Sequence, residues 1–351
     1  MSKKIKILFT IPNFKTAGSQ FVLLAIYNKL DRNLFSPSIL VEKFPDDFPI
    51  KIPKTEQHYI LQKGKTISKI NNLAKFLIKE QIEILHSWDY KSTSIEAIAC
   101  KRAGIKYIYT KKNNAWSKRW FAKSFLSKHI VYNNPDMLDR FFSSYWLKNK
   151  VTFVPHGVDT TIFKPNKKTT NVTNFVIGCI GVLGENKNQL FILKSLKKLP
   201  ENISVEFYGK ADEVYLNKMK SYINSNNLQS RVSLNGFINN KEIPTVMQRF
   251  DVLVLASENE GLPLCLIEAM ACGIPVLSSD SGGGARYIVG DGEGGFIFKN
   301  EEEFIKKVLQ LQNEPTELKA LSEKGINRVK RLFSLEKEVS SYEDTYKKIM
   351  L

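Results

Sequence analysis

The sequence predicts an α/β protein with two doubly wound parallel sheets, and three observations lead to this fold class. Short apolar runs rich in β-branched residues alternate with stretches of helical composition, as in parallel α/β sheets. The alternation stops at a polar linker, residues 164–174, and begins again after it. A chain of 351 residues, 43% of them hydrophobic, also exceeds one comfortable core. We therefore expect one domain over residues 1–165, a second over 166–334, and a terminal helix over 335–351.

Both halves show the same alternation of elements. In the first half, the predicted strands are residues 4–11, 35–41, 82–88 and 106–110, and the predicted helices are 19–30, 67–81 and 92–104. In the second half, the clearest strands are 175–183, 203–209, 251–256 and 275–279, and the clearest helices are 188–199, 214–227, 262–273 and 334–350. Because neighbouring parallel strands need a crossover, helices should cover each sheet. Ligands of such sheets bind beyond the carboxyl ends of the strands.

Positive charge is concentrated in the first half of the chain. Of the formal net charge of +17, residues 1–165 supply nearly all, with 28 Lys and Arg against 12 Asp and Glu, whereas residues 166–351 have 24 against 23. A general preference for Lys would raise both halves alike. The asymmetry predicts an anionic partner for the first half: a membrane surface, a lipid diphosphate, an acidic polysaccharide or a nucleic acid.

One basic segment of the first half also contains aromatic residues. Residues 101–135 have nine bases and no acid, and residues 116–125 interleave aromatic and basic side chains. On a helical wheel the two tryptophans share one side, and Phe121 and Phe125 share another. The pattern therefore suits both a membrane-surface helix and an ordinary solvated helix.

The composition predicts a cytoplasmic protein, with peripheral contact at the inner face of the cell membrane as a further prediction. No run approaches the roughly 20 apolar residues of a membrane-spanning helix. The apolar run near the N-terminus is broken by Pro12 and is followed by no small-residue cleavage site. The four cysteines are scattered through apolar surroundings, which predicts reduced core residues.

A strand, a loop and a helix over residues 251–273 contain the clearest signs of a ligand site. Glu260 falls in the loop at the carboxyl end of the buried strand, and Glu268 lies more than a turn inside the helix. Gly261 lets the backbone approach a ligand, and the free N–H groups at the helix start suit a phosphate. A sugar nucleotide has the hydroxyls, diphosphate and ribose that these groups would hold. Exposed acids near a helix start also occur without any ligand.

The segment from Glu260 to Leu277, EGLPLCLIEAMACGIPVL, resembles the signature of the retaining glycosyltransferases of family 4, also called group 1. The resemblance extends with lower specificity over nearly the whole chain. It implies a GT-B fold, in which two Rossmann-like doubly wound domains face each other across a cleft and the C-terminal helix packs back on the first. It further implies transfer of a sugar from a nucleoside-diphosphate sugar, a UDP-sugar in preference to a GDP-sugar, with retention of configuration.

The resemblance also implies roles for residues around the donor. Glu260 would bind the hydroxyls of the donor sugar, Glu268 the ribose, and Lys187 the diphosphate. Gly261, Leu262 and Pro263 would line the site with backbone, Phe237 and Ile238 would frame the base, and Gly18 and Ser19 would approach the diphosphate from the first domain. No metal ion is expected, because cations and amides would stabilise the leaving diphosphate and the sequence has no Asp-x-Asp.

Two departures from the family pattern concern the diphosphate. Val182 stands where the family has a phosphate-binding Arg, and Arg286 stands where an acid usually follows the glycine loop. Our hypothesis is that Arg286 replaces part of the missing cation. A surface Arg that follows a loop would explain the same residue.

A third departure concerns the first half. In place of the family's His near the donor sugar, the chain has Lys111, Lys112 and Asn113. Of these, Lys112 and Asn113 join Glu260 and Lys187 as candidate catalytic residues. His86 ends a predicted strand, and a lone His there is more often a satisfied core residue. His156 stands at the family's interdomain Asn and is expected to be structural.

These observations predict a glycosyltransferase that uses a glycan or lipid-linked acceptor in the biosynthesis of bacterial surface polysaccharide. No cofactor other than the donor substrate, and no nucleic acid, is expected. Three alternatives stay open. They are a nucleotide-sugar epimerase of the same fold, a basic nucleic-acid-binding module, and a homologue that binds the donor but has lost catalysis. The nucleic-acid module leaves the segment 260–268 unexplained, and the lapsed homologue agrees with Val182 and Arg286.

Overall fold

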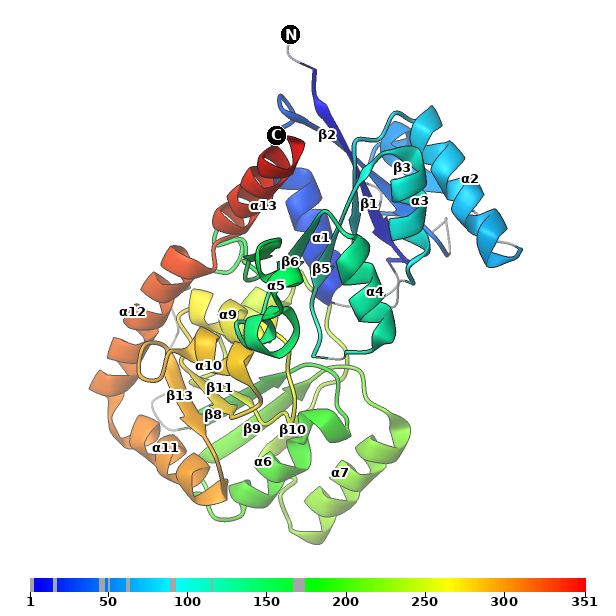
Figure 1. Cartoon of the computed structure of the whole chain (residues 1–351). Coiled ribbons are helices and arrows are strands. Elements are labelled where there is room, and N and C mark those ends of the chain that lie inside the picture. Colours follow the sequence, from blue (N-terminus) through cyan, green and yellow to red (C-terminus); the bar gives the residue numbers. More distant parts are fainter. Residues whose placement is uncertain are drawn as a thin grey trace. The chain divides into compact units, whose positions relative to one another are not determined.

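The computed structural model describes residues 3–14, 18–43, 48–49, 51–60, 64–88, 93–114, 116–166 and 174–351. The chain divides into two compact units (Figure 1). Unit 1 contains residues 1–156 together with 335–351, and unit 2 contains residues 157–334. Each unit has one parallel sheet with helices packed against it, which confirms the predicted α/β class with two doubly wound sheets.

The sheet of unit 1 has the strand order β3-β2-β1-β4-β5-β6-β7, and all neighbouring strands are parallel. Its strands are β1 (Ile5–Ile11), β2 (Phe35–Val41), β3 (Gln57–Tyr59), β4 (Ile84–Ser87), β5 (Lys106–Lys111), β6 (His129–Tyr132) and β7 (Val151–Phe153). The strand order reverses between β1 and β4. The carboxyl ends of these two strands therefore form the switch point at which ligands of doubly wound sheets bind.

The helices of unit 1 enclose its sheet. They are α1 (Gly18–Lys29), α2 (Thr66–Lys79), α3 (Ile95–Ala103), α4 (Lys118–Leu126), α5 (Tyr145–Lys148) and α13 (Leu335–Met350), with a 3₁₀ turn (Lys54–Glu56) and a π-helical turn (Leu138–Phe142). One apolar cluster packs α2, α3 and α4 against the sheet. The last helix of the chain, α13, contacts the first, α1 (Figure 1).

The sheet of unit 2 has the strand order β10-β9-β8-β11-β12-β13, again with all neighbours parallel. Its strands are β8 (Phe175–Ile180), β9 (Ile203–Tyr208), β10 (Val232–Leu234), β11 (Val252–Leu255), β12 (Val276–Ser279) and β13 (Gly295–Phe298). The order reverses between β8 and β11. The switch point of unit 2 therefore lies at the carboxyl ends of these strands.

Two apolar clusters cover opposite faces of this sheet, because successive residues of β11 belong alternately to one cluster and the other. The helices are α6 (Gln189–Leu196), α7 (Glu213–Ser225), α8 (Ile243–Met247), α9 (Leu264–Ala271), α10 (Gly283–Val289), α11 (Glu301–Asn313) and α12 (Pro315–Leu332). One cluster contains residues of α6, α7 and α11, and the other contains residues of α9 and α10. Helix α12 contributes to both.

The limits of α9 follow from its sequence. Pro263 has extended backbone angles, so the helix begins at Leu264 and is shorter than the predicted 262–273. It ends before Gly273, whose φ of +77° is the left-handed conformation that glycine adopts without strain. Ile274 N donates to the carbonyl of Ala269 (2.9 Å), which is the 6→1 hydrogen bond of a Schellman motif. The backbone conformations of Pro263 and Gly273 therefore fix both ends of α9.

Candidate active site

The loops after β8 and β11 bring Lys187 and Glu260 together. Lys187 ends the 3₁₀ turn Glu185–Lys187, and Glu260 lies in the loop between β11 and α9. Lys187 Nζ and Glu260 Oε1 are 2.6 Å apart, and 26% and 14% of the two side chains are exposed. The sequence placed both residues at the donor, and the structure joins them at the switch point of unit 2.

Main-chain hydrogen bonds hold these two loops against each other. Glu258 N donates to the carbonyl of Asn186 (2.9 Å), and Asn186 Nδ2 donates to the carbonyl of Asn259 (3.2 Å). Glu260 N donates to the carbonyl of Ser281 in the loop after β12 (3.0 Å). The backbone at Glu260 is therefore positioned by two neighbouring loops as well as by its own ion pair.

Lys187 keeps its positive charge in this partly buried place. Burial lowers the pKa of the ammonium, but the neighbouring Cys265 and Glu260 raise that pKa, and the net shift is upward. Burial also raises the pKa of the Cys265 thiol to about 12, so this thiol is neutral at pH 7. The carboxylate of Glu260 is thus the negative charge that holds Lys187 protonated.

Glu268 lies on α9, and burial raises its pKa to about 7. At neutral pH this carboxyl is therefore divided between its charged and neutral forms. Hydroxyl groups that donated hydrogen bonds to this carboxylate would stabilise its charged form, and the contact to a ribose stays a prediction.

Two serine hydroxyls beside the ion pair are buried without a hydrogen-bond partner in the described part of the chain: Ser257 Oγ and Ser281 Oγ. Buried hydroxyls are normally paired, so both have hydrogen-bonding capacity that the described protein groups do not use. A hollow of about 450 Å³, within the size range of small-molecule sites, lies at the same edge of the sheet. Its lining comes from α6 and from the ends of β11, β12 and β13: Asn188, Phe191, Ala256, Ser257, Glu258, Ser279, Asp280, Phe298 and Lys299.

The loop after β9 lies close to the loop after β8. Gly209 has a φ of +152°, and a Cβ at this position would lie 1.8 Å from the carbonyl oxygen of Gly181. Lys210, the residue that follows, was not among the predicted site residues. Its Nζ lies 4.9 Å from the ring centre of Phe237, and that exposed ring and Ile238 are the predicted walls of the base. The signal was its place directly after a predicted strand.

Arg286 lies on α10 and pairs with Asp280, with 2.7 Å between Arg286 Nε and Asp280 Oδ1. Its proposed action on a diphosphate stays a prediction. Val182, at the position of the family's Arg, is 61% exposed, and its carbonyl accepts a hydrogen bond from Gln189 Nε2 (3.0 Å). The loop after β8 thus contains the cation Lys187, and it has the apolar side chain of Val182 where the family has a second cation, an Arg.

In unit 1, Trp88 joins the carboxyl ends of three strands. Gly18 and Ser19 begin α1 after β1, and Trp88 Nε1 donates to the carbonyl of Ser19 (2.7 Å). Lys112, after β5, donates to the carbonyl of Trp88 and lies 4.4 Å from the centre of its ring. The residues before Gly18, Thr16 and Ala17, lie outside the described residues. Trp88 was missed because a buried Trp after a strand is typical of a core.

Asn113 is held by Lys111, which was not among the candidate catalytic residues. Lys111 Nζ donates to the main-chain carbonyl of Asn113 (2.5 Å) and to its Oδ1 (2.7 Å). Burial, together with the nearby Lys123, lowers the pKa of Lys111 to about 7. Lys112 and Asn113 thus lie at the carboxyl edge of the sheet with defined partners, and their catalytic role stays a prediction.

His86 and His156, two of the four histidines of unit 1, are buried and have side-chain partners. His86 is fully buried, with Nδ1 2.7 Å from the hydroxyl of Tyr346 and Nε2 2.8 Å from Thr110 Oγ1. Burial lowers its pKa well below the ordinary value, so the ring is neutral at pH 7. His156 Nδ1 lies 2.9 Å from Glu338 Oε1. Both rings therefore connect the sheet of unit 1 to α13.

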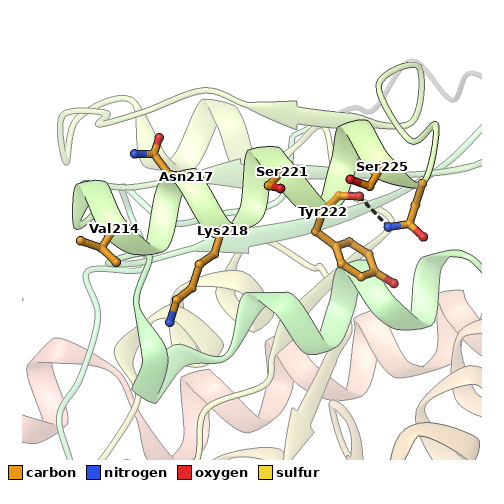
Figure 2. Close-up of a pocket in the computed structure, with 7 residues that line it drawn as sticks. Val214, Asn217, Lys218, Ser221, Tyr222 and Ser225 are labelled. Carbon is orange, nitrogen blue, oxygen red and sulfur yellow. Dashed lines mark hydrogen bonds between the residues drawn. The ribbon is translucent and has the colours of Figure 1, made fainter.

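Another hollow, of about 620 Å³, lies on the surface of α7. Figure 2 shows its side chains, which come from α7 and from Asn226 just after it: Val214, Asn217, Lys218, Ser221, Tyr222 and Ser225. Ligand sites usually bring polar groups together from several elements, and this surface presents one helix. It therefore adds nothing to the site at the switch point.

Within the described ranges, no three His, Cys, Asp or Glu side chains lie close enough to hold a metal ion together. In the same part of the chain, every helix is too short or too polar to cross a lipid bilayer.

Two family models match this chain. The model described as "Glycosyl transferases group 1" matches residues 160–328, and the model described as "Glycosyltransferase Family 4" matches residues 17–162. Together they span residues 17–328, which include the whole sheet of unit 2 and every strand of unit 1 after β1. The segments that carried the resemblance in the sequence lie inside these matches.

Individual proteins show the same similarity. The UDP-Gal:alpha-D-GlcNAc-diphosphoundecaprenol alpha-1,3-galactosyltransferase of Escherichia coli is 26% identical over 310 residues, 80% of this chain and 79% of that protein. The putative glycosyltransferase EpsF of Bacillus subtilis (strain 168) is 24% identical over 311 residues, 80% of each chain. The crystal structure of Anabaena Alr3699/HepE in complex with UDP has a TM-score of 0.85 at 17% identity, covering 99% of this chain and all of that one. This last likeness shows a shared fold.

Proposed function

Because the chain belongs to the group 1 glycosyltransferases and has their GT-B fold, we propose that it transfers a sugar from a UDP-sugar to a hydroxyl of a glycan or lipid-linked acceptor. The transfer retains the configuration of the sugar and serves the biosynthesis of bacterial surface polysaccharide. The observation that carries the proposal is the Lys187–Glu260 pair at the switch point of unit 2, beside the start of α9. An activated sugar needs a carboxylate and a cation at this place.

Two relatives support the nature of the substrates. The Anabaena protein of similar fold was crystallised with UDP, and the name of the Escherichia coli relative contains a UDP-sugar and a lipid diphosphate. The excess of positive charge in residues 1–165 suits an acceptor or a surface with negative charge. Unit 2 would bind the donor, and unit 1 would bind the acceptor.

Each residue at the switch point has a role in this proposal. Glu260 accepts hydrogen bonds from the hydroxyls of the donor sugar and orients its anomeric carbon. Lys187 and the N–H groups at the start of α9 stabilise the charge that develops on the leaving diphosphate, without a metal ion. Glu268 accepts hydrogen bonds from the ribose. The partly buried setting strengthens these contacts, because solvent screens them less than it does at the surface.

The test compares Glu260→Gln and Lys187→Ala with a matched control pair. Lys198 and Glu301 form an exposed ion pair in the same unit, with Nζ and Oε2 2.5 Å apart. We expect each change at the site to lower the rate of transfer by roughly 100-fold or more, because Glu260→Gln removes the carboxylate that orients the sugar and Lys187→Ala removes a cation that stabilises the leaving diphosphate. Lys198→Ala and Glu301→Gln should leave the rate unchanged. Transfer to a polyprenyl-diphosphate sugar is followed by chromatography, and folding by circular dichroism.

The outcome separates the proposal from its alternatives. Wild-type turnover in both site variants would overturn the assignment of these residues. A new nucleotide sugar formed without acceptor would favour the epimerase. Binding of UDP without turnover on a panel of acceptors would favour the lapsed homologue, in agreement with Val182 at the position of the family's Arg.

A further inference from the structure

Four large aromatic side chains of unit 1 face solvent on α4 and α5. The exposed fraction is 55% for Phe121, 59% for Phe125, 71% for Tyr145 and 73% for Trp146. Helices α4 and α5, to which these residues belong, contact each other within unit 1 (Figure 1). We name these four residues the aromatic surface. Single exposed apolar residues are ordinary, whereas four large ones on two contacting helices indicate an interaction surface.

The structure decides which side of α4 faces outward. Trp120 is only 8% exposed, and Trp116 stacks on Phe141 with the ring centres 4.8 Å apart. Phe121 and Phe125 are one turn apart and more than half exposed. The two tryptophans that the sequence placed on one side therefore pack into the unit, and the two phenylalanines form the outer stripe.

Exposed bases outnumber exposed acids in the segment that contains the aromatic surface. Between residues 116 and 150, the exposed charged residues are five bases and one acid, Asp139. The bases are Lys118, Arg119, Lys128, Arg140 and Lys148. Lys150 Nζ donates to the main-chain carbonyls of Phe125 (2.9 Å) and Ser127 (3.0 Å), which ties the end of α4 to the segment that follows α5. The surface is therefore held in place by the fold and is strongly basic.

We propose that the aromatic surface docks unit 1 onto a bilayer that contains anionic phospholipid. Aromatic side chains lie at the level of the lipid headgroups, and the Lys and Arg side chains of the same segment are attracted to the negative surface. The inference deepens the proposed function and rests on it for its meaning, because a lipid-linked acceptor lies in a bilayer. The docking itself requires neither donor nor acceptor.

The chemistry of the surface favours a bilayer over the other polyanions and partners. Phe121 and Phe125 have no polar group with which to bind a base edge or a sugar. Single-stranded nucleic acid needs a basic groove along which bases stack, and the two hollows described above are both lined by residues of unit 2. A second copy of the chain would bring two sets of five bases together, which opposes self-association.

Trp146 gives a direct signal for docking. Of the four tryptophans, Trp88 and Trp120 are buried, Trp116 is half-buried, and Trp146 is the exposed one. Vesicles of phosphatidylcholine with phosphatidylglycerol should therefore shift the tryptophan fluorescence of the full chain to shorter wavelength. They should also protect that fluorescence from quenching by acrylamide. Vesicles of phosphatidylcholine alone should have a much weaker effect. Trp146→Phe should keep most of the binding, measured by co-sedimentation, and lose the shift.

Two double variants test the surface itself. Tyr145→Ser with Trp146→Ser, and Phe121→Ser with Phe125→Ser, should each weaken binding to anionic vesicles at least tenfold. The control is Ile67→Ser with Ile78→Ser on α2, because these residues of the same unit are 68% and 60% exposed. The control should bind like the wild type. Added salt should weaken binding of every form that binds, because it screens the cations.

Three results would overturn the inference. One is anionic vesicles that leave the emission of Trp146 unchanged, and another is double variants that bind like the wild type. The third is a wild-type chain that self-associates in sedimentation through the aromatic surface, which would assign that surface to a second copy. Transfer to a water-soluble short-chain acceptor distinguishes the two proposals. If transfer persists while vesicle binding fails, only the docking falls; if vesicles bind and transfer is absent, only the proposed function falls.

Discussion

The ion pair of Lys187 and Glu260 is more protected than an ordinary surface pair. Its side chains are 26% and 14% exposed, whereas those of Lys198 and Glu301 are 61% and 33% exposed. Solvent and salt therefore screen the first pair less than the second. Removing Lys187 alone leaves a partly buried carboxylate without its cation, which is destabilising. Part of any loss of activity in Lys187→Ala is then a loss of folded protein, and Lys187→Ala combined with Glu260→Gln separates the two effects.

Glu268 lowers the stability of unit 2 at neutral pH. Its pKa in the folded protein is about 7, above the ordinary value of 4.5. The folded state therefore binds this proton more tightly than the unfolded state does. The contribution of Glu268 to stability is complete below pH 4.5 and is lost as the pH rises through 7.

Glu268→Gln should accordingly stabilise the protein at pH 8 and have little effect at pH 5, because Gln resembles the neutral carboxyl. Part of the side chain reaches solvent, so we expect a gain on the order of 1–2 kcal/mol, or several degrees in Tm. The same change should weaken the binding of UDP, because it removes the carboxylate that accepts hydrogen bonds from the ribose in the proposed complex. Thermal unfolding at both pH values and calorimetric titration with UDP measure the two effects.

The matched control is Glu323→Gln, which changes an exposed acid on α12 of the same unit and should shift Tm equally little at both pH values. A Glu268→Gln protein whose Tm differs from the wild type by the same amount at pH 5 and pH 8 would contradict the proposed titration.

At the scale of the elements, the loops after β8 and β9 depend on a close backbone contact. A Cβ on Gly209 would lie 1.8 Å from the carbonyl oxygen of Gly181, and a φ of +152° is unfavourable for any other residue. Gly209→Ala should therefore destabilise unit 2 by roughly 3 kcal/mol or more, because backbone atoms cannot move aside as a side chain can. Urea denaturation, followed by circular dichroism, measures the change.

Gly292→Ala is the control for Gly209→Ala. Gly292 also has a positive φ, +85°, but a Cβ there would have no heavy atom within 4 Å. Gly292→Ala should lower the free energy of unfolding only by the strain of the left-handed conformation, about 1–2 kcal/mol. Equal losses in the two variants would show that the φ angle, and not the contact with Gly181, limits this position.

Long strands could be predicted from the sequence, and two strands of three residues could not. The strands β1, β2, β8 and β9 have six or seven residues of apolar, β-branched character, and each was expected close to its observed place. Strands β3 and β7 have three residues each, which is too few to show a period, and neither was predicted. Their pairing depends on neighbours in the sheet that lie far away in the sequence.

The same distinction applies to the site. Glu260 and Gly261 could be found because a strand, a loop and a helix start follow each other within one segment. That Lys187 reaches Glu260 also requires β8 and β11 to be neighbours, and topology places them so. Trp88 and Lys210 were missed because their partners, Ser19 and Phe237, belong to other loops. Contacts between loops are visible only once the strand order is known.

At the scale of the whole molecule, the chain leaves unit 1 at residue 156 and returns to it at residue 335. Unit 1 is therefore completed only when the last helix has been made. Five apolar side chains of α13 are buried: Leu335, Val339, Tyr342, Tyr346 and Ile349. At roughly 1.5–3 kcal/mol for each, they contribute on the order of 10 kcal/mol, which is comparable to the whole stability of a domain.

A chain that ends at Ser334 should consequently lose the fold of unit 1 and keep that of unit 2. Without α13, the buried His86 and His156 lose their partners Tyr346 and Glu338, which adds the cost of unsatisfied polar groups. Hydrogen exchange read by mass spectrometry resolves the two units peptide by peptide. We expect fast exchange throughout residues 1–156 and slow, wild-type exchange in β8, β11 and α9.

Asp344→Ala with Lys347→Ala is the control for this truncation, because it removes two exposed charges from α13 and leaves its buried face intact. It should keep wild-type exchange in both units. Slow exchange in β1 and β4 of the truncated chain would contradict the argument, since these strands would then be stable without the helix that supplies Tyr346 to His86. Loss of protection in unit 2 as well would mean that its stability also depends on α13.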